Sequence, residues 1–280
     1  MYEIVRKEIL TPTISLIEIK APMISERAEP GQFVIVRVEE EGERVPFTIN
    51  DFDRENGTVT IIFQLVGYST YKMNTLKAGD YLYDIVGPLG LATHTEGLKK
   101  VAVVGGGVGN AIAFPIARKL HQQGCEVHAI TGFKNADVVI LENEYADAST
   151  RHIVCTDDGS HGRKGLVTEI LKELIDEGNE YDQVIAIGPM PMMKFVSLTT
   201  KPYGIKTIVS LCPLMVDGTG MCGCCRVVVG GEMKFACVDG PDFDGHEVDW
   251  ELAISRGKIY GDFEREVREA NCNLLNAEVK

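Results

Sequence analysis

The sequence predicts a small antiparallel β-barrel, then a parallel, doubly wound α/β domain, then a short cysteine-rich segment. Three observations predict this order. The first third of the chain consists of short alternating apolar runs between turns. The middle third alternates buried strands with helices, and beyond it glycine and cysteine become frequent. We therefore expect four units, with boundaries at 1–97, 98–209 and 210–250 and a helical tail at 251–280.

Composition limits the kind of protein. The 280 residues are 45% hydrophobic and 25% charged, which is ordinary for globular domains of common size. The formal charge of -13 repels polyanions, so we expect no nucleic-acid partner. The first residues are charged where a signal peptide is apolar, and no run reaches the roughly 20 apolar residues that span a bilayer. We expect a soluble cytoplasmic protein without a membrane partner.

Alternating runs predict the barrel. Apolar and polar residues alternate over 14–19, 33–38 and 59–63, and turns rich in Gly, Pro and Asp separate these runs. Such short, regularly spaced strands are typical of a small antiparallel barrel.

The pattern changes near Lys99. A buried-strand run at 101–104, a glycine turn at 105–109 and a helical spacing over 110–122 form a strand-turn-helix unit. Strands that alternate with helices predict a parallel sheet. Further strands are expected at 127–130, 138–141 and 184–187, with an amphipathic helix at 166–175.

The glycine turn suits a dinucleotide. Gly105, Gly106, Gly107 and Gly109 would let the backbone approach a pyrophosphate, and the next helix would offer free N–H groups. The spacing departs from G-x-G-x-x-G because Ala111 and the residue after it stand where the last glycine is expected. A purely structural turn is the alternative.

Two further segments fit a nucleotide on this sheet. Gly188, Pro189 and Met190 follow a late strand, where a ligand would cross the carboxyl edge, although an ordinary helix start has the same sequence. Asp157 and Asp158 suit an adenosine ribose or a plain loop.

The barrel carries two segments suited to a flavin. Val45, Pro46, Phe47 and Thr48 offer a flat ring beside a hydroxyl. A small turn with hydroxyls at Ser69 and Thr70 follows a later strand. A ring can lie on an isoalloxazine, and hydroxyl donors can hold its N5 or a pyrophosphate. Each segment alone also fits an ordinary turn.

The cysteine-rich stretch has the strongest spacing. Asp217, Cys222, Cys225 and Cys237 read D-x4-C-x2-C-x11-C, which is the plant-type [2Fe-2S] spacing with aspartate in the first place. Zinc with mixed ligands and a metal-free thiol cluster are the alternatives. Cys224 breaks the spacing and is expected to point away; a reserve ligand candidate stands at Cys212.

The other cysteines and the histidines suggest no further site. Cys125 and Cys155 lie in or beside apolar strands and are interpreted as core thiols. The spacing of five histidines shows no metal-ligand pairing: His94, His121, His128, His152 and His161.

The order of these motifs resembles the ferredoxin-NADP reductase superfamily over nearly the whole chain. The motifs are Val-Pro-Phe-Thr, Gly-Tyr-Ser-Thr, Gly-Pro-Leu-Gly at 87–90, the glycine turn, Thr-Asp-Asp-Gly-Ser at 156–160, Gly-Pro and the cysteine loop. The chain looks like the group that holds the electron-transfer subunit of dihydroorotate dehydrogenase B and the small subunit of NADH-dependent ferredoxin:NADP oxidoreductase. The aspartate at 217, in place of the first cluster cysteine, makes this segment resemble the second of these subunits.

The resemblance implies cofactors and a partner. It implies FAD between the barrel and the sheet, NAD(H) over the glycine turn, and a [2Fe-2S] cluster that passes electrons to a larger flavin/iron-sulfur oxidoreductase subunit, of electron-bifurcating type. The alternatives are dihydroorotate oxidation and a non-enzymatic, zinc-stabilised nucleotide-binding module. The flavin residues that carry over are Val45, Pro46, Phe47, Thr48, Ile62, Phe63, Gln64, Ser69 and Thr70.

This sequence departs from the superfamily in two places. The dihydroorotate-type subunit usually begins its first flavin motif with arginine, whereas position 45 is valine and Arg44 stands one residue earlier. The superfamily's cysteine before the Gly-Pro pair is replaced by Ile187. The resemblance therefore implies that positioning, rather than a thiol, shapes the hydride site.

Overall fold

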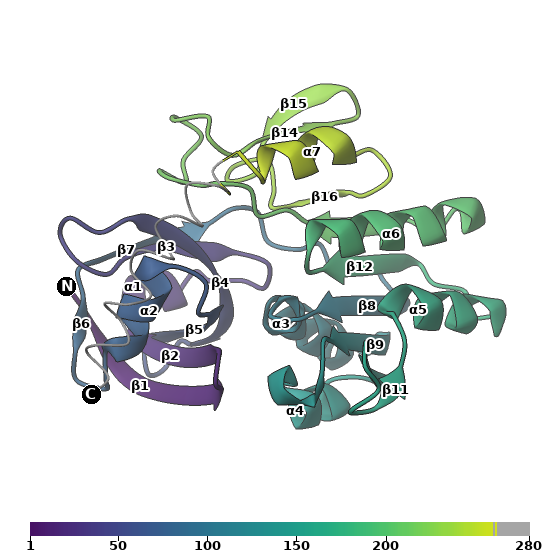
Figure 1. Cartoon of the computed structure of the whole chain (residues 1–280), viewed down its shortest axis with the longest axis horizontal. Helices are drawn as coiled ribbons and strands as arrows, with labels where there is room; N and C mark the ends of the chain where they lie inside the picture. The colour runs from purple at the N-terminus through teal and green to yellow at the C-terminus, as the bar shows by residue number, and fades with distance from the viewer. Residues whose placement is uncertain (260, 262–280) are drawn as a thin grey trace.

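A computed structural model describes residues 1–259 and 261. The barrel, the larger sheet and a small hairpin unit with the last helix form three parts, with the hairpin unit above the other two (Figure 1). The predicted tail helix from about residue 260 lies outside the described residues except for 261. No helix among the described residues is long and apolar enough to cross a membrane.

The first seven strands form one antiparallel sheet in the order β6-β1-β2-β5-β4-β3-β7. The two edge strands are separated in the chain by Tyr83 alone, so the sheet curls until it is nearly closed. The predicted runs fall on β2, β3 and β5, which confirms the barrel. The strands are β1 (Tyr2–Thr11), β2 (Ile14–Lys20), β3 (Phe33–Arg37), β4 (Arg44–Asp53), β5 (Thr58–Gln64), β6 (Tyr81–Leu82) and β7 (Asp84–Leu89), with helices α1 (Pro22–Ser25) and α2 (Tyr68–Thr75).

The second sheet has the order β11-β10-β9-β8-β12-β13-β16 and is parallel except for β16. The chain starts at β8 in the middle, builds outward on one side, and returns to the other side at β12. The switch point between β8 and β12 is where such sheets bind ligands. The strands are β8 (Lys100–Gly106), β9 (Glu126–Phe133), β10 (Arg151–Thr156), β11 (Arg163–Lys164), β12 (Gln183–Ile187), β13 (Thr207–Ser210) and β16 (Asp242–Asp244).

Helices cover both faces of this sheet. Val101 and Val103 of β8 pack on α3 (Gly109–Gln122), whereas Ala102 and Val104 pack on α5 (Val167–Asp176). The alternation follows from the two-residue period of a strand. Both predicted helices are therefore confirmed. The remaining helices are η1 (Ala136–Val138), α4 (Glu142–Asp147), α6 (Met190–Thr200), η2 (Lys201–Tyr203) and α7 (Trp250–Arg256).

The strand predicted at 138–141 is wrong. The short helix η1 ends at Val138, and Leu141 has a left-handed φ of 57° where α4 begins. Ile140 is buried, but it packs with Ile14 and Ile62 of the barrel instead of joining the sheet. The apolar run thus reflects contact between two domains, which a local pattern does not distinguish from a strand.

Specific bonds join the three parts. Asn50 of β4 donates to the carbonyl of Ala111 in α3 at 2.7 Å. The guanidinium of Arg44 donates to the carbonyl of Val216 at 2.7 Å, which ties the barrel to the cysteine-rich segment. That segment folds as the hairpin of β14 (Arg226–Val229) and β15 (Glu232–Phe235) before β16 joins the larger sheet.

Candidate cofactor and cluster sites

The glycine turn after β8 packs against the end of β12. A Cβ on Gly109 would lie 2.4 Å from the carbonyl oxygen of Ile187 and 2.7 Å from the Cα of Gly188. A Cβ on Gly106 would lie 2.4 Å from the sulfur of Met192. The structure therefore brings the two predicted nucleotide segments together, and glycine is required there because the two backbones approach closely.

The same turn keeps one open side. Gly107 has a φ of 56° and nothing within 4 Å of an added Cβ. Its N–H donates to the carbonyl of Gly132 at 2.8 Å, which fixes the turn to β9. Two helices begin beside this turn, α3 at Gly109 and α6 at Met190 with Pro189 as its N-cap. Helix N-termini favour anions, so this edge suits a dinucleotide pyrophosphate.

The acidic pair lies at the far corner of this edge. Asp158 accepts hydrogen bonds from the N–H and hydroxyl of Ser160 at 2.9 and 2.6 Å. The N–H of Asp157 donates to the carbonyl of Phe133 at 3.0 Å. Both aspartates and Lys134 are exposed. The two aspartates, which would repel a 2'-phosphate, and Lys134, which would attract it, thus lie on adjacent loops.

The predicted flavin strand faces the nucleotide turn. Phe47 and Thr48 are half-buried on β4, three and two residues before Asn50, whose amide donates to the backbone of Ala111. Ala111 follows the glycine turn directly. Asn50 was missed by sequence reasoning, although a polar residue in an apolar strand is a signal that something polar lies opposite.

The flavin residues implied by the resemblance on β5, at 62–64, divide between core and surface. The Phe63 ring packs edge-on against Phe47, with ring centroids 5.9 Å apart, and belongs to the barrel core. Ile62 is buried against the second domain, and Gln64 is exposed. Ile62 and Phe63 therefore present little side-chain surface to a ligand.

The predicted hydroxyl turn is the start of a helix. Gly67 is the N-cap of α2, and the Thr70 hydroxyl accepts hydrogen bonds from the N–H groups of Gly67 and Val66 at 3.1 and 3.0 Å. The Ser69 hydroxyl donates to Glu43 at 2.7 Å. Both hydroxyls already have partners, because Ser and Thr bind local backbone and side-chain groups at helix starts.

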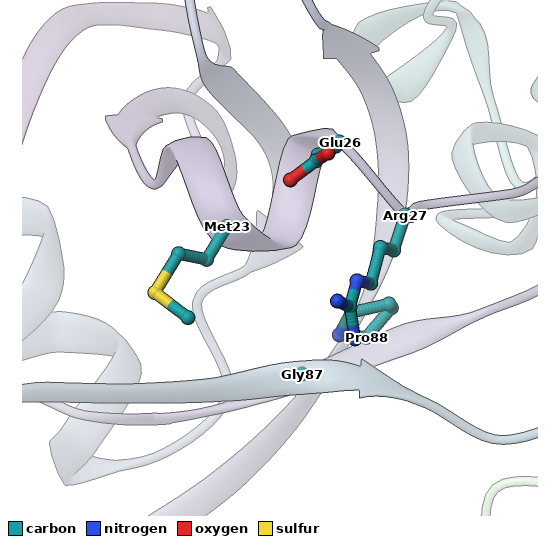
Figure 2. A pocket seen from close by; sticks show the side chains of 5 residues that line it. All are labelled: Met23, Glu26, Arg27, Gly87 and Pro88. Atoms are coloured by element: carbon teal, nitrogen blue, oxygen red, sulfur yellow. The ribbon is translucent and has the colours of Figure 1, made fainter.

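Two cavities lie on the barrel. One of ≈ 310 Å³ adjoins Ser69 and the loop before β4. The guanidinium of Arg44 donates to the carbonyl of Val216, and Arg44 does not line this cavity. Within the described part of the chain, Lys72 is the cation that lines it. The other, of ≈ 290 Å³, lies between α1 and β7, and none of the predicted site residues lines it (Figure 2). Its lining residues are Met23, Glu26, Arg27, Gly87 and Pro88.

Asp217 closes the cluster loop, which we define as residues 217–225. Its carboxylate accepts hydrogen bonds from the N–H groups of Thr219 and Met221 at 3.1 and 3.2 Å, and from the N–H of Cys222 at 3.3 Å. Bonds from the Cys222 side chain and from Thr219 hold the pKa of Asp217 well below its ordinary value. Asp217 is thus a turn cap that stays ionised.

Three glycines shape the loop. Gly218, Gly220 and Gly223 have φ values of 80°, 84° and 67°, which side chains rarely adopt. The backbone of the loop therefore turns sharply at these three positions.

Two of the four loop-associated thiols form a buried pair. The sulfurs of Cys225 and Cys237 are 3.1 Å apart and buried. Burial, and then the neighbouring Cys225 thiol, raises the pKa of Cys237 to about 12. Cys222 is exposed and Cys224 is half-buried, and the Cys222 thiol raises the pKa of Cys224. The expectation that Cys224 points away stays a prediction.

Three further cysteines of the described residues lie outside the cluster loop. Cys125 and Cys155 are buried, at 4% and 1% exposure, in the sheet's hydrophobic clusters, as predicted for core thiols. Cys212 is exposed.

The donor set fits a two-iron cluster. A [2Fe-2S] cluster takes two protein ligands on each iron. The buried sulfurs of Cys225 and Cys237, 3.1 Å apart, suit one iron, and the N–H of Cys222 donates to Asp217 at 3.3 Å, which brings the other two candidate ligands together. The flavin fits less directly, because both α2 hydroxyls have internal partners.

Solved structures share this architecture. The structure of an NADH-dependent reduced ferredoxin-NADP oxidoreductase, from work on flavin-based electron bifurcation, is 40% identical with a TM-score of 0.91 and covers 96% of this chain and 97% of that chain. The ferredoxin reductase of carbazole 1,9a-dioxygenase has a TM-score of 0.63 at 19% identity, covering 73% of this chain and 65% of that chain. The second likeness shows the fold alone.

A family model confirms the role of the cysteine-rich segment. The iron-sulfur cluster binding domain of dihydroorotate dehydrogenase B matches residues 213–249, a range that includes the cluster loop and Cys237. Together with the barrel and the doubly wound sheet, it defines a flavin- and iron-sulfur-dependent NAD(P)H oxidoreductase subunit.

Relatives define the family. A Thermotoga maritima homolog of the electron transfer subunit of dihydroorotate dehydrogenase B is 43% identical over 94% of this chain and 93% of its own length. The Fusobacterium nucleatum electron transfer subunit is 33% identical over 84% of this chain and 92% of its own length. An uncharacterized protein of Clostridium beijerinckii is 48% identical over 97% of this chain and 96% of its own length. The chain belongs to the family of dihydroorotate dehydrogenase B electron-transfer subunits and their homologues.

Proposed function

We propose that this chain accepts hydride from NADH on a bound FAD and passes single electrons through a [2Fe-2S] cluster to a larger flavin/iron-sulfur subunit in the cytoplasm. The observation that carries the proposal is the bond from Asn50 to Ala111. It joins the strand of the flavin motif to the helix of the nucleotide turn, and hydride transfer needs its two reactants in contact.

The assembly we favour is an NADH-dependent ferredoxin:NADP oxidoreductase of electron-bifurcating type. The 40% identical structure of that enzyme and the aspartate at 217 support this choice. The runner-up is dihydroorotate oxidation, which the names of several relatives favour. Purifying the native complex and identifying the companion subunit distinguishes them: a dihydroorotate-oxidising companion would overturn our choice.

The chain's own contribution to catalysis is placement. Bound flavin supplies two-electron acceptance and one-electron release. Gly107 and the starts of α3 and α6 would hold the dinucleotide, with Gly105, Gly106, Gly109, Gly188, Pro189 and Met190 forming the edge. Ile187 offers no thiol beside this edge, so geometry alone has to align the reacting carbon and nitrogen at about 3–3.5 Å. We assign no proton-transfer residue.

The proposed flavin and cluster residues keep their sequence assignment. Val45, Pro46, Phe47 and Thr48 on β4 would contact the flavin, with backbone contributions from Ile62, Phe63 and Gln64 and polar contacts from Ser69 and Thr70. The proposed cluster ligands are Asp217, Cys222, Cys225 and Cys237.

The protein prepared anaerobically is expected to hold about one FAD and one [2Fe-2S] cluster per chain, since both motif sets lie in one polypeptide. Flavin absorbance after acid release, with iron and acid-labile sulfide assays, measures both. A colourless, zinc-containing preparation would instead support the nucleotide-binding module.

NADH is expected to reduce the flavin faster and with tighter binding than NADPH. Asp157 and Asp158 are exposed at the corner where the adenosine ribose would lie, and they would repel a 2'-phosphate. Stopped-flow reduction with each nucleotide tests this. A double variant with Asn at both positions should reduce the preference for NADH over NADPH. A Lys134→Ala variant should increase this preference. Tighter binding and faster reduction by NADPH would contradict the assignment.

Asp217→Cys is expected to keep the cluster but to shift its optical and EPR spectra and its potential. A sulfur would then replace an oxygen on iron, and thiolate is the softer, more covalent ligand. Cys212→Ser is the control and should change no spectrum. Unchanged spectra in Asp217→Cys, with cluster loss in Cys212→Ser, would show that the loop binds iron differently.

A further inference from the structure

Helix α3 carries a proline in its interior, at Pro115. Proline has no N–H, so it cannot donate to the carbonyl four residues earlier, and its ring crowds that oxygen. The carbonyl four residues before Pro115 belongs to Ala111. The side-chain amide of Asn50, on β4 of the barrel, donates to this carbonyl at 2.7 Å. The acceptor that the proline releases from the helix is therefore the one that the other domain uses.

The bond between Asn50 and Ala111 is shielded from water. Asn50 is 6% exposed and Ala111 is 1% exposed, and Pro115 is buried as well. A buried carbonyl without a hydrogen-bond donor is strongly unfavourable, so a proline at 115 requires a donor from elsewhere. The proline leaves the oxygen without its helical donor, and the asparagine supplies one across the domain boundary.

A β-bulge directs two polar side chains of β4 toward the helix. Ile49 pairs with Ile61 of β5, whereas Asp51 pairs with Thr60, so Asn50 is the extra residue of the bulge. Ile49 is buried in the barrel core. Strict alternation would place Asp51 on the same side as Ile49, but the bulge lets Asn50 and Asp51 both bond to α3.

Arg118 of α3 is the partner of Asp51. Its guanidinium donates to both carboxylate oxygens of Asp51, at 3.0 and 2.5 Å. Ala111, Pro115 and Arg118 follow one another at four and three residues, which places them along one face of α3. Both side chains of the ion pair are partly exposed, so solvent weakens it, and the two-point bond mainly fixes orientation. The buried amide bond of Asn50 is therefore the stronger link between the domains.

We propose that Asn50, Ala111 and Pro115 form an interdomain latch that sets the rate of hydride transfer, with Pro115 as a positioning residue that acts through the Ala111 carbonyl. Asn50 lies two residues after the flavin segment at 45–48, and Ala111 lies two residues after Gly109 of the nucleotide turn. A shift at the latch would change the separation of flavin and nicotinamide, and about 1 Å can cost about 100-fold in rate. The effect on rate rests on the proposed function, whereas the coupling of Asn50 with Pro115 does not.

The test is a double-mutant cycle of Asn50→Ala and Pro115→Ala in the whole, flavin-loaded chain. Asn50→Ala should lower the thermal unfolding temperature by about 2–8 °C, because it leaves the Ala111 carbonyl buried without the donor from the barrel. Pro115→Ala restores an N–H at position 115, so the same oxygen gains a helical partner. In the Pro115→Ala background, Asn50→Ala should therefore lower the unfolding temperature by less than about 2 °C.

The rate should respond differently from the stability. At saturating NADH, flavin reduction should slow by at least about tenfold in Asn50→Ala and in the double variant, because neither links the domains at Ala111. The dissociation constant for NADH and the FAD content should stay within about threefold of the parent's, since the latch lies outside the proposed nucleotide and flavin contacts. If the asparagine only satisfied a buried carbonyl, the double variant would recover rate and stability together.

Asn56→Ala is the matched control. Asn56 is exposed and its amide donates to Asp53 in the same turn, so this variant should match the parent in stability and in rate. The inference is overturned if Asn50→Ala costs the same stability with and without Pro115, or if Asn50→Ala and the double variant reduce flavin at the parent's rate. A parent whose flavin NADH does not reduce would refute the proposed function. Unfolding needs no NADH, so the cycle would still measure the coupling between Asn50 and Pro115.

Discussion

Cys237→Ala is expected to remove the cluster while leaving the flavin in place. Cys237 is 3% exposed and its sulfur lies 3.1 Å from that of Cys225, so no solvent-exposed group can replace it. Altering a residue that merely supports a metal ligand costs about 10–100-fold in affinity, so loss of a buried ligand should exceed that range. Alanine is chosen because a serine oxygen can still bind iron. Iron and sulfide assays, with FAD content, measure the result.

Electron flow should then stop after the flavin. Stopped-flow reduction of the flavin by NADH should continue at a rate close to the parent's, whereas electrons should no longer reach the partner subunit. Cys155→Ala is the matched control, since Cys155 is also buried, at 1% exposure, but lies in the core of the sheet. Equal cluster loss in both variants would indicate a folding defect, and an intact cluster in Cys237→Ala would refute the ligand assignment.

The sequence predicted the architecture where local patterns carry the information. The period of two in the barrel strands and the alternation of strands with α3 and α5 follow from burial on one or two faces. The run at 138–141 shows the limit of this reasoning. Its apolar residues are buried by the barrel, so only the packing of two domains reveals why they are apolar.

The candidate site was predictable in its components but not in its contacts. Spacing together with the family resemblance predicted a cluster segment that includes Cys222, Cys225 and Cys237, and the family model matches this segment at residues 213–249. The contact of Cys225 with Cys237 joins residues twelve positions apart, which spacing alone does not bring together. Asn50 was missed because its partner is a backbone carbonyl of a distant helix.

Gly109→Ala is expected to weaken NADH binding and to destabilise the second domain. The added methyl carbon would lie 2.4 Å from the carbonyl oxygen of Ile187 and 2.7 Å from the Cα of Gly188, and both neighbours are backbone atoms that cannot rotate away. Overpacking of this kind costs about 1–3 kcal/mol. The turn and the end of β12 would have to separate, and a displacement of about 1 Å at a reacting centre can cost about 100-fold in rate. We expect flavin reduction by NADH to slow by at least about tenfold.

The control is Gly124→Ala, at the other end of α3. Gly124 has a φ of 83° and nothing within 4 Å of an added Cβ, so alanine there meets backbone strain of about 1–2 kcal/mol but no clash. The thermal unfolding temperature should therefore fall in both variants, because each substitution strains the same domain. Only Gly109→Ala should change the NADH concentration dependence of flavin reduction, because only it separates the two segments of the nucleotide edge. Parallel kinetic losses in the two variants would mean that global stability, and not the contact between Gly109 and Gly188, controls the reaction with NADH.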